Sequence, residues 1–307
     1  MQHQFKAGER VKHAKKSSWG LGEVLADSTS NRVKVLFEDE GIKEFELSLA
    51  NFTLVTGEEA DSNYLTALVR SLYSEKNPTT GVANKKANVF TSFPKAIDVF
   101  LSYFPNGFQD EAYLEGKSNE RSYKIAAHES MAQQLNQETF SKLIQDDEFN
   151  EICIRAKNVL KINLIYKFEN ILIGNALAKI ENQKPFAEGL FDLLFSDDDM
   201  SARFERFSTM LDEINAAKWP IATLFLFVMF PDNHMFLKPQ VTQNAAGVLG
   251  MDINYRSDLN WLTYKRVLEL AEMIRTKLLK DGRDVLAPRD LIDVQSFIWV
   301  IAPSYYS

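Results

Sequence analysis

The spacing of hydrophobic residues changes near residue 56, and this change constrains the fold more than any other feature of the sequence. Before it, a β-branched and aromatic run, Val33–Phe37, is bounded by the turn-forming cluster of residues 27–31. After it, apolar residues recur at the helical spacing i, i+3, i+4 and i+7, beginning with Leu65, Leu68, Val69 and Leu72. The sequence therefore predicts an α+β protein, with strands in residues 1–56 and an all-helical domain in residues 57–307.

The first 56 residues are expected to form a small β-barrel. Gly41 follows three acidic residues and is available for a turn with positive φ. Ile42, Phe45 and Leu47 can then point inward from the next strand. Four or five strands in so short a segment cannot form an open sheet with a good core. Closure into a five-stranded barrel removes the free edges and buries one face.

Three motifs in this segment resemble a known domain. Their order is Gly8 to Ala14 (GERVKHA), Trp19 to Val24 (WGLGEV), and then Val33 to Phe37 (VKVLF) followed by Gly41-Ile42-Lys43. This series resembles the small Tudor-like domain at the C-terminus of UvrD/PcrA-type DNA helicases and related stand-alone bacterial domains. The resemblance covers about 50 of 307 residues. It implies an SH3/Tudor-like barrel that docks on RNA polymerase or nucleic acid, without helicase activity, because no motor is present.

Basic and aromatic side chains of the predicted barrel are candidates for partner binding. Such side chains together suit contact with phosphates, bases or acidic proteins. The alternative is that the lysines are solvated and that Trp19 packs on the barrel rim. Phe37 and Phe45 are expected in the core, which argues against a methyl-lysine cage. The candidates are Lys12, His13, Lys15, Lys16, Trp19 and Lys43.

Charge and hydropathy limit the classes of partner. The first 56 residues hold equal numbers of basic and acidic residues, so the net charge of −7 falls on the helical part. Nucleic acid is therefore expected to contact the N-terminal barrel only. The longest apolar run, residues 221–230, is half the length that a membrane-spanning helix needs, so no membrane is expected. The polar start and the single cysteine, Cys153, favour a cytoplasmic protein.

The predicted helical domain offers weak candidates for chemistry. Arg121, Lys124 and His128 share one face of a helix predicted at 120–135 and form either an anion-binding face or a solvated surface. His234 beside Asp232 is either an acid–base pair or part of a structural turn. No catalytic motif, cofactor site or metal site is recognised, and His3, His13, His128 and His234 are too scattered for zinc.

Two further features of the helical domain concern its loops and helix breaks. An exposed loop is expected at about residues 77–88, which contain Pro78, Gly81 and few apolar residues. The stretch 148–181 is long enough for one helix, or for two that are broken near Asn170 or Gly174.

These features favour a non-enzymatic accessory protein. Its barrel would dock on a nucleic-acid-processing partner, such as RNA polymerase or DNA-repair machinery, and its helical domain would supply a second binding surface. One alternative is a component of a bacterial restriction or anti-phage defence system, with a helical domain that senses DNA or a ligand. Another is an enzyme of an unrecognised family with its site in the helical domain.

Overall fold

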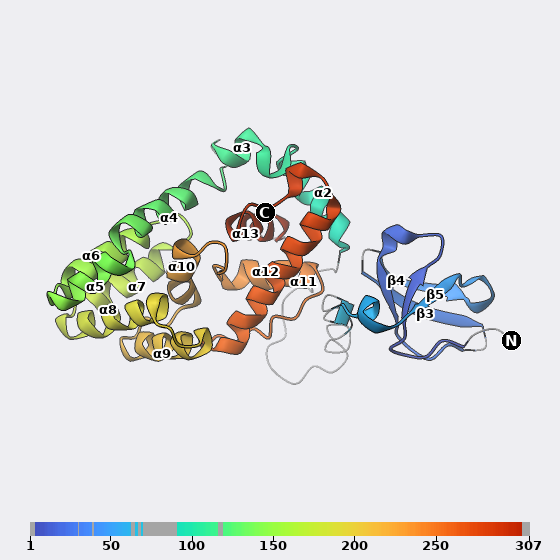
Figure 1. Ribbon diagram of the computed structural model, residues 1–307, viewed down its shortest axis with the longest axis horizontal. Coiled ribbons are helices and arrows are strands. Elements are labelled where there is room, and N and C mark those ends of the chain that lie inside the picture. Colours follow the sequence, from blue (N-terminus) through green and yellow to red (C-terminus); the bar gives the residue numbers. More distant parts are fainter. Residues whose placement is uncertain are drawn as a thin grey trace. The chain divides into compact units, whose positions relative to one another are not determined.

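A computed structural model gives the structure of the protein (Figure 1). It describes residues 4–29, 31–38, 40–62, 65–66, 69, 91–115 and 119–302, and the loop predicted at residues 77–88 lies outside this set. The chain divides into two compact units. The first comprises Met1–Ser102, Asn244–Asp252 and Ile301–Ser307, and the second comprises Tyr103–Gln243 and Ile253–Val300. Strands precede helices along the chain, so the predicted α+β class is confirmed.

The first unit contains a five-stranded antiparallel sheet, drawn in blue in Figure 1. Strand β1 pairs with both β2 and β5, while β3 joins β2 to β4. Phe37 and Gly41 face each other at the end of the β3–β4 hairpin, and Gly41 has the predicted positive φ, 76°. The strands are β1 (Arg10–His13), β2 (Leu21–Val24), β3 (Arg32–Phe37), β4 (Gly41–Glu46) and β5 (Phe52–Val55).

The prediction of a closed barrel is wrong. The strand order β4-β3-β2-β1-β5 leaves β4 and β5 at the two edges, with no ladder between them among the described residues. Phe45 of β4 and Phe52 of β5 meet across this seam, with ring centroids 5.0 Å apart and planes at 88°. The sheet curls far enough for these side chains to cover its core. Aromatic packing therefore takes the place of backbone hydrogen bonds at the seam.

Alternating side chains of the central strands form the core of the sheet. Val11, Val33, Val35 and Phe37 are buried together on its inner side. A Cβ on Gly22 would lie 2.7 Å from Cδ1 of Phe37 and 2.8 Å from Cγ1 of Val35. Only glycine leaves room for the Phe37 ring, and this ring supports the seam.

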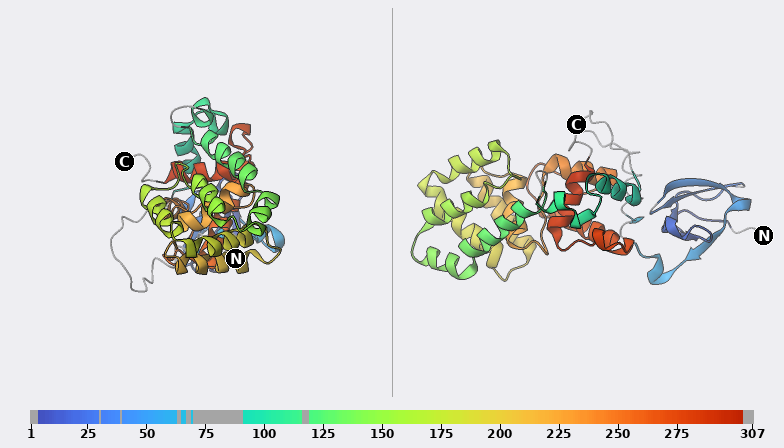
Figure 2. Two further views of the ribbon diagram at one scale, coloured as in Figure 1. Left: turned by 90° about the vertical axis from the view of Figure 1, so that its left-hand side faces the viewer. Right: turned by 90° about the horizontal axis from the view of Figure 1, so that it is seen from above.

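Helices dominate the rest of the described chain (Figures 1 and 2). The region predicted as one helix or two at 148–181 contains α6, α7 and the start of α8, so the main break falls at residues 160–166. The α-helices are α2 (Phe93–Tyr103), α3 (Glu111–Leu114), α4 (Ser122–Gln134), α5 (Gln137–Gln145), α6 (Phe149–Val159), α7 (Lys167–Leu177), α8 (Ile180–Phe195), α9 (Met200–Glu213), α10 (Trp219–Met229), α11 (Pro239–Val248), α12 (Trp261–Asp281) and α13 (Leu291–Ile301).

Helix α10 lies at the centre of the second unit. Every residue from Trp219 to Met229 is buried, and the helix packs against α4, α7, α8 and α9. Pro220 lies near its start, where a missing N–H costs no helical hydrogen bond. The apolar run in the sequence is thus a core helix, as expected. Within the described residues, no helix has the length and apolar character that crossing a membrane requires.

Candidate functional site

His13, Trp19 and Lys43 lie together on the inner side of the curled sheet. His13 is paired with Phe52 in the β1–β5 register, and Lys43 is paired with the buried Val35. Paired residues point to the same face, so both side chains reach toward the core. Trp19 ends a short 3₁₀ helix, η1 (Ser17–Trp19), and its ring lies 4.9 Å from the His13 ring.

Four half-buried rings form what we call the aromatic rim: His13, Trp19, Phe45 and Phe52. Their neighbouring centroids are 4.9 to 6.1 Å apart. The rim packs on the fully buried Phe37, which confirms that Phe37 fills the core. Phe45, expected in the core, is instead partly open to solvent. Phe52 is a rim residue that no sequence motif indicates, and its place opposite His13 follows from the strand register.

Hydrogen bonds and charge define the polar character of the rim. The backbone N–H of Lys15 donates to Nδ1 of His13 at 3.1 Å, which leaves the ring proton on Nε2. Nζ of Lys43 lies 5.8 Å from the Trp19 centroid and 2.9 Å from a carboxylate oxygen of Glu40. A cation over the indole face is favourable. The rim therefore combines apolar ring surface with one imidazole N–H donor and one lysine.

The remaining basic candidates occupy two other places. Lys12 alternates with Val11 and His13 along β1, so it points to the outer face of the sheet, where it pairs with Glu59 at 3.3 Å. Lys15 and Lys16 are exposed between β1 and η1, and no ion pair is formed by either within the described part of the chain. The six predicted residues are thus divided among the rim, the adjacent loop and the opposite face.

One family model matches this part of the chain. It covers residues 5–55 and is described as "Protein of unknown function (DUF3553)". The match coincides with the five-stranded sheet and leaves most of the chain uncovered. No curated protein and no solved structure matches the chain. The likeness to the helicase Tudor-like domain therefore remains a resemblance in sequence.

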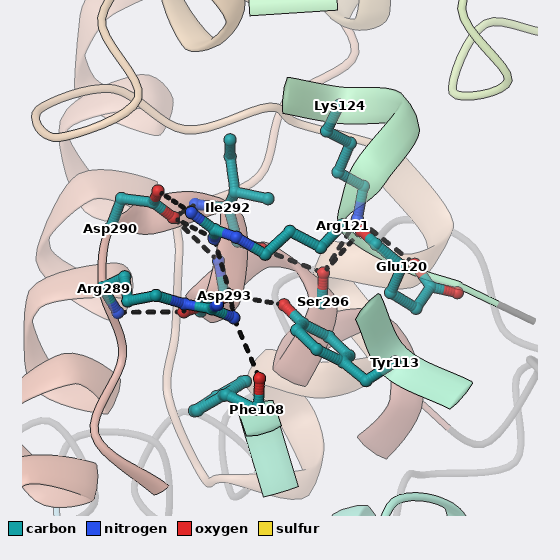
Figure 3. Close-up of polar contacts among 10 residues, drawn as sticks. All are labelled: Phe108, Tyr113, Glu120, Arg121, Lys124, Arg289, Asp290, Ile292, Asp293 and Ser296. Carbon is teal, nitrogen blue, oxygen red and sulfur yellow. Dashed lines mark hydrogen bonds and ion pairs between the residues drawn. The ribbon is translucent and has the colours of Figure 1, made fainter. Parts of the chain in front are cut away.

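Arg121 and Lys124, two of the three residues of the second predicted set, belong to a polar cluster that joins α4 to α13 (Figure 3). We call it the α4–α13 cluster; its members are Tyr113, Glu120, Arg121, Lys124, Arg289, Asp290, Asp293 and Ser296. The Arg121 guanidinium donates to Asp290 at 2.6 and 2.8 Å and to Asp293 at 2.7 Å. Two carboxylates therefore already neutralise this arginine.

Asp293 is the acceptor at the centre of the cluster. It is fully buried and accepts from Arg121, from the Tyr113 hydroxyl at 2.5 Å and from the Arg289 side chain and backbone. Burial, and then the Asp293 charge, raise the pKa of Tyr113 well above its usual value. Tyr113 is therefore a neutral donor to the Asp293 carboxylate.

Lys124 is completely enclosed, so the solvated alternative for this helix face is wrong. Its ammonium donates to Glu120 at 3.2 Å and to the hydroxyl of Ser296 at 2.8 Å. Burial lowers the pKa of Lys124, and the Glu120 carboxylate opposes this shift. A lysine beside a serine hydroxyl is also an arrangement used to activate nucleophiles. Here both side chains are buried, so no substrate reaches them, and the pair holds α4 against α13.

His128 does not converge with the other two residues. Its Nδ1 donates to the backbone carbonyl of Val228 at 2.7 Å and so attaches α4 to α10. An anion would have to displace the carboxylates from Arg121 and Lys124, and it would find His128 turned toward a different helix. Anion binding by the three residues remains a prediction that these contacts do not favour.

The half-buried His234 stacks on the buried Tyr264. The rings are nearly parallel, at 4°, and Nδ1 lies 3.3 Å from the Tyr264 hydroxyl oxygen. Burial, followed by the charge of Arg203, lowers the pKa of His234 to about 4. These contacts support the structural alternative over an acid–base pair with Asp232. In the described ranges, no group of three or more His, Cys, Asp or Glu side chains is placed to hold a metal ion.

Proposed function

We propose that the protein is a non-enzymatic interaction protein whose N-terminal sheet docks on a partner through the aromatic rim and the adjacent Lys15 and Lys16. The half-buried rings at the seam carry this proposal. Partly exposed aromatic side chains supply much of the binding energy at protein interfaces and also stack on nucleic-acid bases. The two lysines beside them add attraction for an acidic protein or a phosphate backbone.

The nature of the partner is proposed from the resemblance to the helicase Tudor-like domain. A nucleic-acid-processing assembly, of the RNA polymerase or DNA-repair type, presents both acidic protein surface and nucleic acid. The balanced charge of the first 56 residues fits a local contact better than a broad electrostatic one. The α4–α13 cluster adds no open catalytic position that would favour an enzyme.

Charge reversal of individual lysines tests the proposal. Lys12 is close to Lys15 and Lys16 in the sequence but lies on the opposite face of the sheet, so the variants can be compared. Lys15→Glu with Lys16→Glu should weaken binding of the full-length protein to purified RNA polymerase by roughly tenfold, while Lys12→Glu should change it little. Lys12 is the matched control, since it lies on the outer face beside Glu59. Surface plasmon resonance at two salt concentrations measures the affinity.

The result for single-stranded DNA decides between the two kinds of partner surface. If the polymerase is not bound and the DNA is bound through the same lysines, nucleic acid is the partner. Equal losses from the Lys15 and Lys16 double variant and from Lys12→Glu would remove the rim from the interface. Absence of binding to both probes would reject the proposal.

A further inference from the structure

Helix α7 is apolar on two sides, and only one of them is packed. Ile173, Ala176 and Leu177 are buried against neighbouring helices of the second unit. Phe168 and Ile171 point the other way and remain 65% and 51% exposed. A helix that is apolar all round is normally buried all round. We define the α7 face as the outward residues Lys167, Phe168, Ile171, Gly174 and Asn175, which recur at helical spacing.

The surroundings of the α7 face are basic in a chain that is acidic overall. Between residues 155 and 184 the sequence has six Lys/Arg and two Asp/Glu, against a net charge of −7 for the whole chain. Two of these cations, Arg155 and Lys184, pair with Glu151 and Glu188 just outside this range, and Glu169 pairs with Lys238 at 3.3 Å. Lys161, Lys167 and Lys179 are exposed, and none makes an ion pair with another described residue. A surface with apolar and acidic side chains would complement the α7 face.

Gly174 shapes the middle of the α7 face. A Cβ built at this position meets no atom within 4 Å, so the helix surface is open there. A second helix that crosses α7 at Gly174 could approach the α7 backbone closely, because glycine has no side chain there. Helices pack in this way when side-chain ridges of one enter grooves of the other. A lipid surface, in contrast, gains nothing from a glycine and would prefer a large apolar side chain.

We propose that the α7 face binds an amphipathic helix of a partner protein, with leucine-like side chains over Phe168 and Ile171 and acidic side chains beside Lys161, Lys167 and Lys179. This surface lies in the second unit and is distinct from the aromatic rim. The two proposals can therefore fail separately, because the Lys15 and Lys16 variants leave the α7 face unchanged.

A labelled synthetic helix with leucines on one side and glutamates on the other is the probe. The full-length protein should bind it in fluorescence anisotropy, and should bind a scrambled peptide and a lysine-for-glutamate peptide far less. Phe168→Ser with Ile171→Ser should weaken binding by about tenfold or more, since each loses buried apolar area. Leu279→Ser is the control, because Leu279 is 52% exposed on α12.

Two further variants separate charge and shape. Lys161→Glu with Lys167→Glu should weaken binding by about tenfold, whereas Lys265→Glu with Lys280→Glu, the same charge change on α12, should not. Gly174→Leu should preserve the circular dichroism spectrum, since the space is open, and should still reduce binding.

Three outcomes overturn the proposal. The first is no preference for the Leu–Glu helix over its scrambled or lysine versions. The second is binding to vesicles containing phosphatidylserine that Gly174→Leu strengthens, which would make the α7 face a lipid contact. The third is self-association that Phe168→Ser with Ile171→Ser abolishes, which would make the occupant a second copy of this chain.

Discussion

At the scale of single residues, the structure depends on positions where one atom more or less changes the packing. Gly22 leaves the space that the Phe37 ring fills, and Phe37 in turn contacts three rings of the aromatic rim, those of Trp19, Phe45 and Phe52. His234 is held neutral in a half-buried stack with Tyr264. Each position gives a measurable prediction.

Gly22→Ala should destabilise the sheet by about 1–3 kcal/mol, because the added methyl overlaps Phe37 and Val35 within an already filled core. Urea unfolding followed by fluorine NMR of protein labelled with 5-fluorotryptophan, which resolves Trp19 from the other three tryptophans, measures the change. Gly174→Ala is the matched control, and its helical site with open space predicts no loss or a gain of up to about 1 kcal/mol. A Gly22→Ala protein as stable as the unsubstituted one would show that Phe37 moves freely, and the account of the seam would be wrong.

His234 should make the stability of the second unit depend on pH. Its pKa is about 4 in the folded protein and near the ordinary value of 6.5 when unfolded, so the unfolded state binds more protons between these values. Stability is therefore retained above about pH 6.5 and decreases by roughly 3 kcal/mol as the pH falls to about 4. His234→Phe should flatten this part of a urea-midpoint profile. A slope that persists unchanged in the variant would assign it to other groups.

At the scale of helices and strands, local sequence signals predict where an element lies better than they predict which other elements it contacts. Pro220 and Pro231 bound an apolar run, and α10 is the buried helix that they predict. The break after α6 is not where the sequence predicts it, because residues 160–166 contain neither glycine nor proline and retain apolar spacing. Seam closure by Phe45 and Phe52 was also missed, since alternation predicts which side a residue faces and not whether edge strands pair.

The basic row on α4 shows why the candidate sites were harder to predict. Arg121 and Lys124 are spaced like a solvent-facing row, and nothing near them in the sequence indicates burial. Their acceptors Asp290, Asp293 and Ser296 lie about 170 positions later, so the contacts exist only in the folded chain. At the N-terminus the register of β1 separates Lys12 from His13, a distinction that composition alone does not make.

Asp293→Asn should test the contribution of the α4–α13 cluster. The substitution keeps the shape but removes the charge that Arg121, Arg289 and Tyr113 share, and loss of one partner in a buried ion pair costs about 3–5 kcal/mol. Chemical unfolding monitored by far-ultraviolet circular dichroism measures the difference. Glu188→Gln, in an exposed pair with Lys184, is the control and should cost less than about 1 kcal/mol. Similar costs for both would show that the cluster is loosely held.

At the scale of the whole molecule, the chain comprises two compact units of unequal core size. The sheet has a small cluster of buried residues, whereas the second unit buries α10 from end to end. Small cores bury a lower fraction of their surface and are less stable. Trp19 lies in the first unit, and Trp219, Trp261 and Trp299 lie in the second.

Labelling with 5-fluorotryptophan should therefore reveal two unfolding transitions by fluorine NMR. The Trp19 resonance, assigned by Trp19→Phe, is expected to convert to its unfolded position at a lower urea concentration than the other three. All four resonances converting together would instead indicate a single cooperative unit.

The long sequence separation within the α4–α13 cluster also determines when this part of the protein can finish folding during its synthesis. Residues 121 and 124 leave the ribosome many seconds before residues 290–296, at the usual rates of translation. Until then Arg121 and Lys124 lack their contacts with residues 290–296, so α4 cannot take its final packed position. The helical unit therefore stays incompletely folded during synthesis, and α4 reaches its native packing only after α13 has been made.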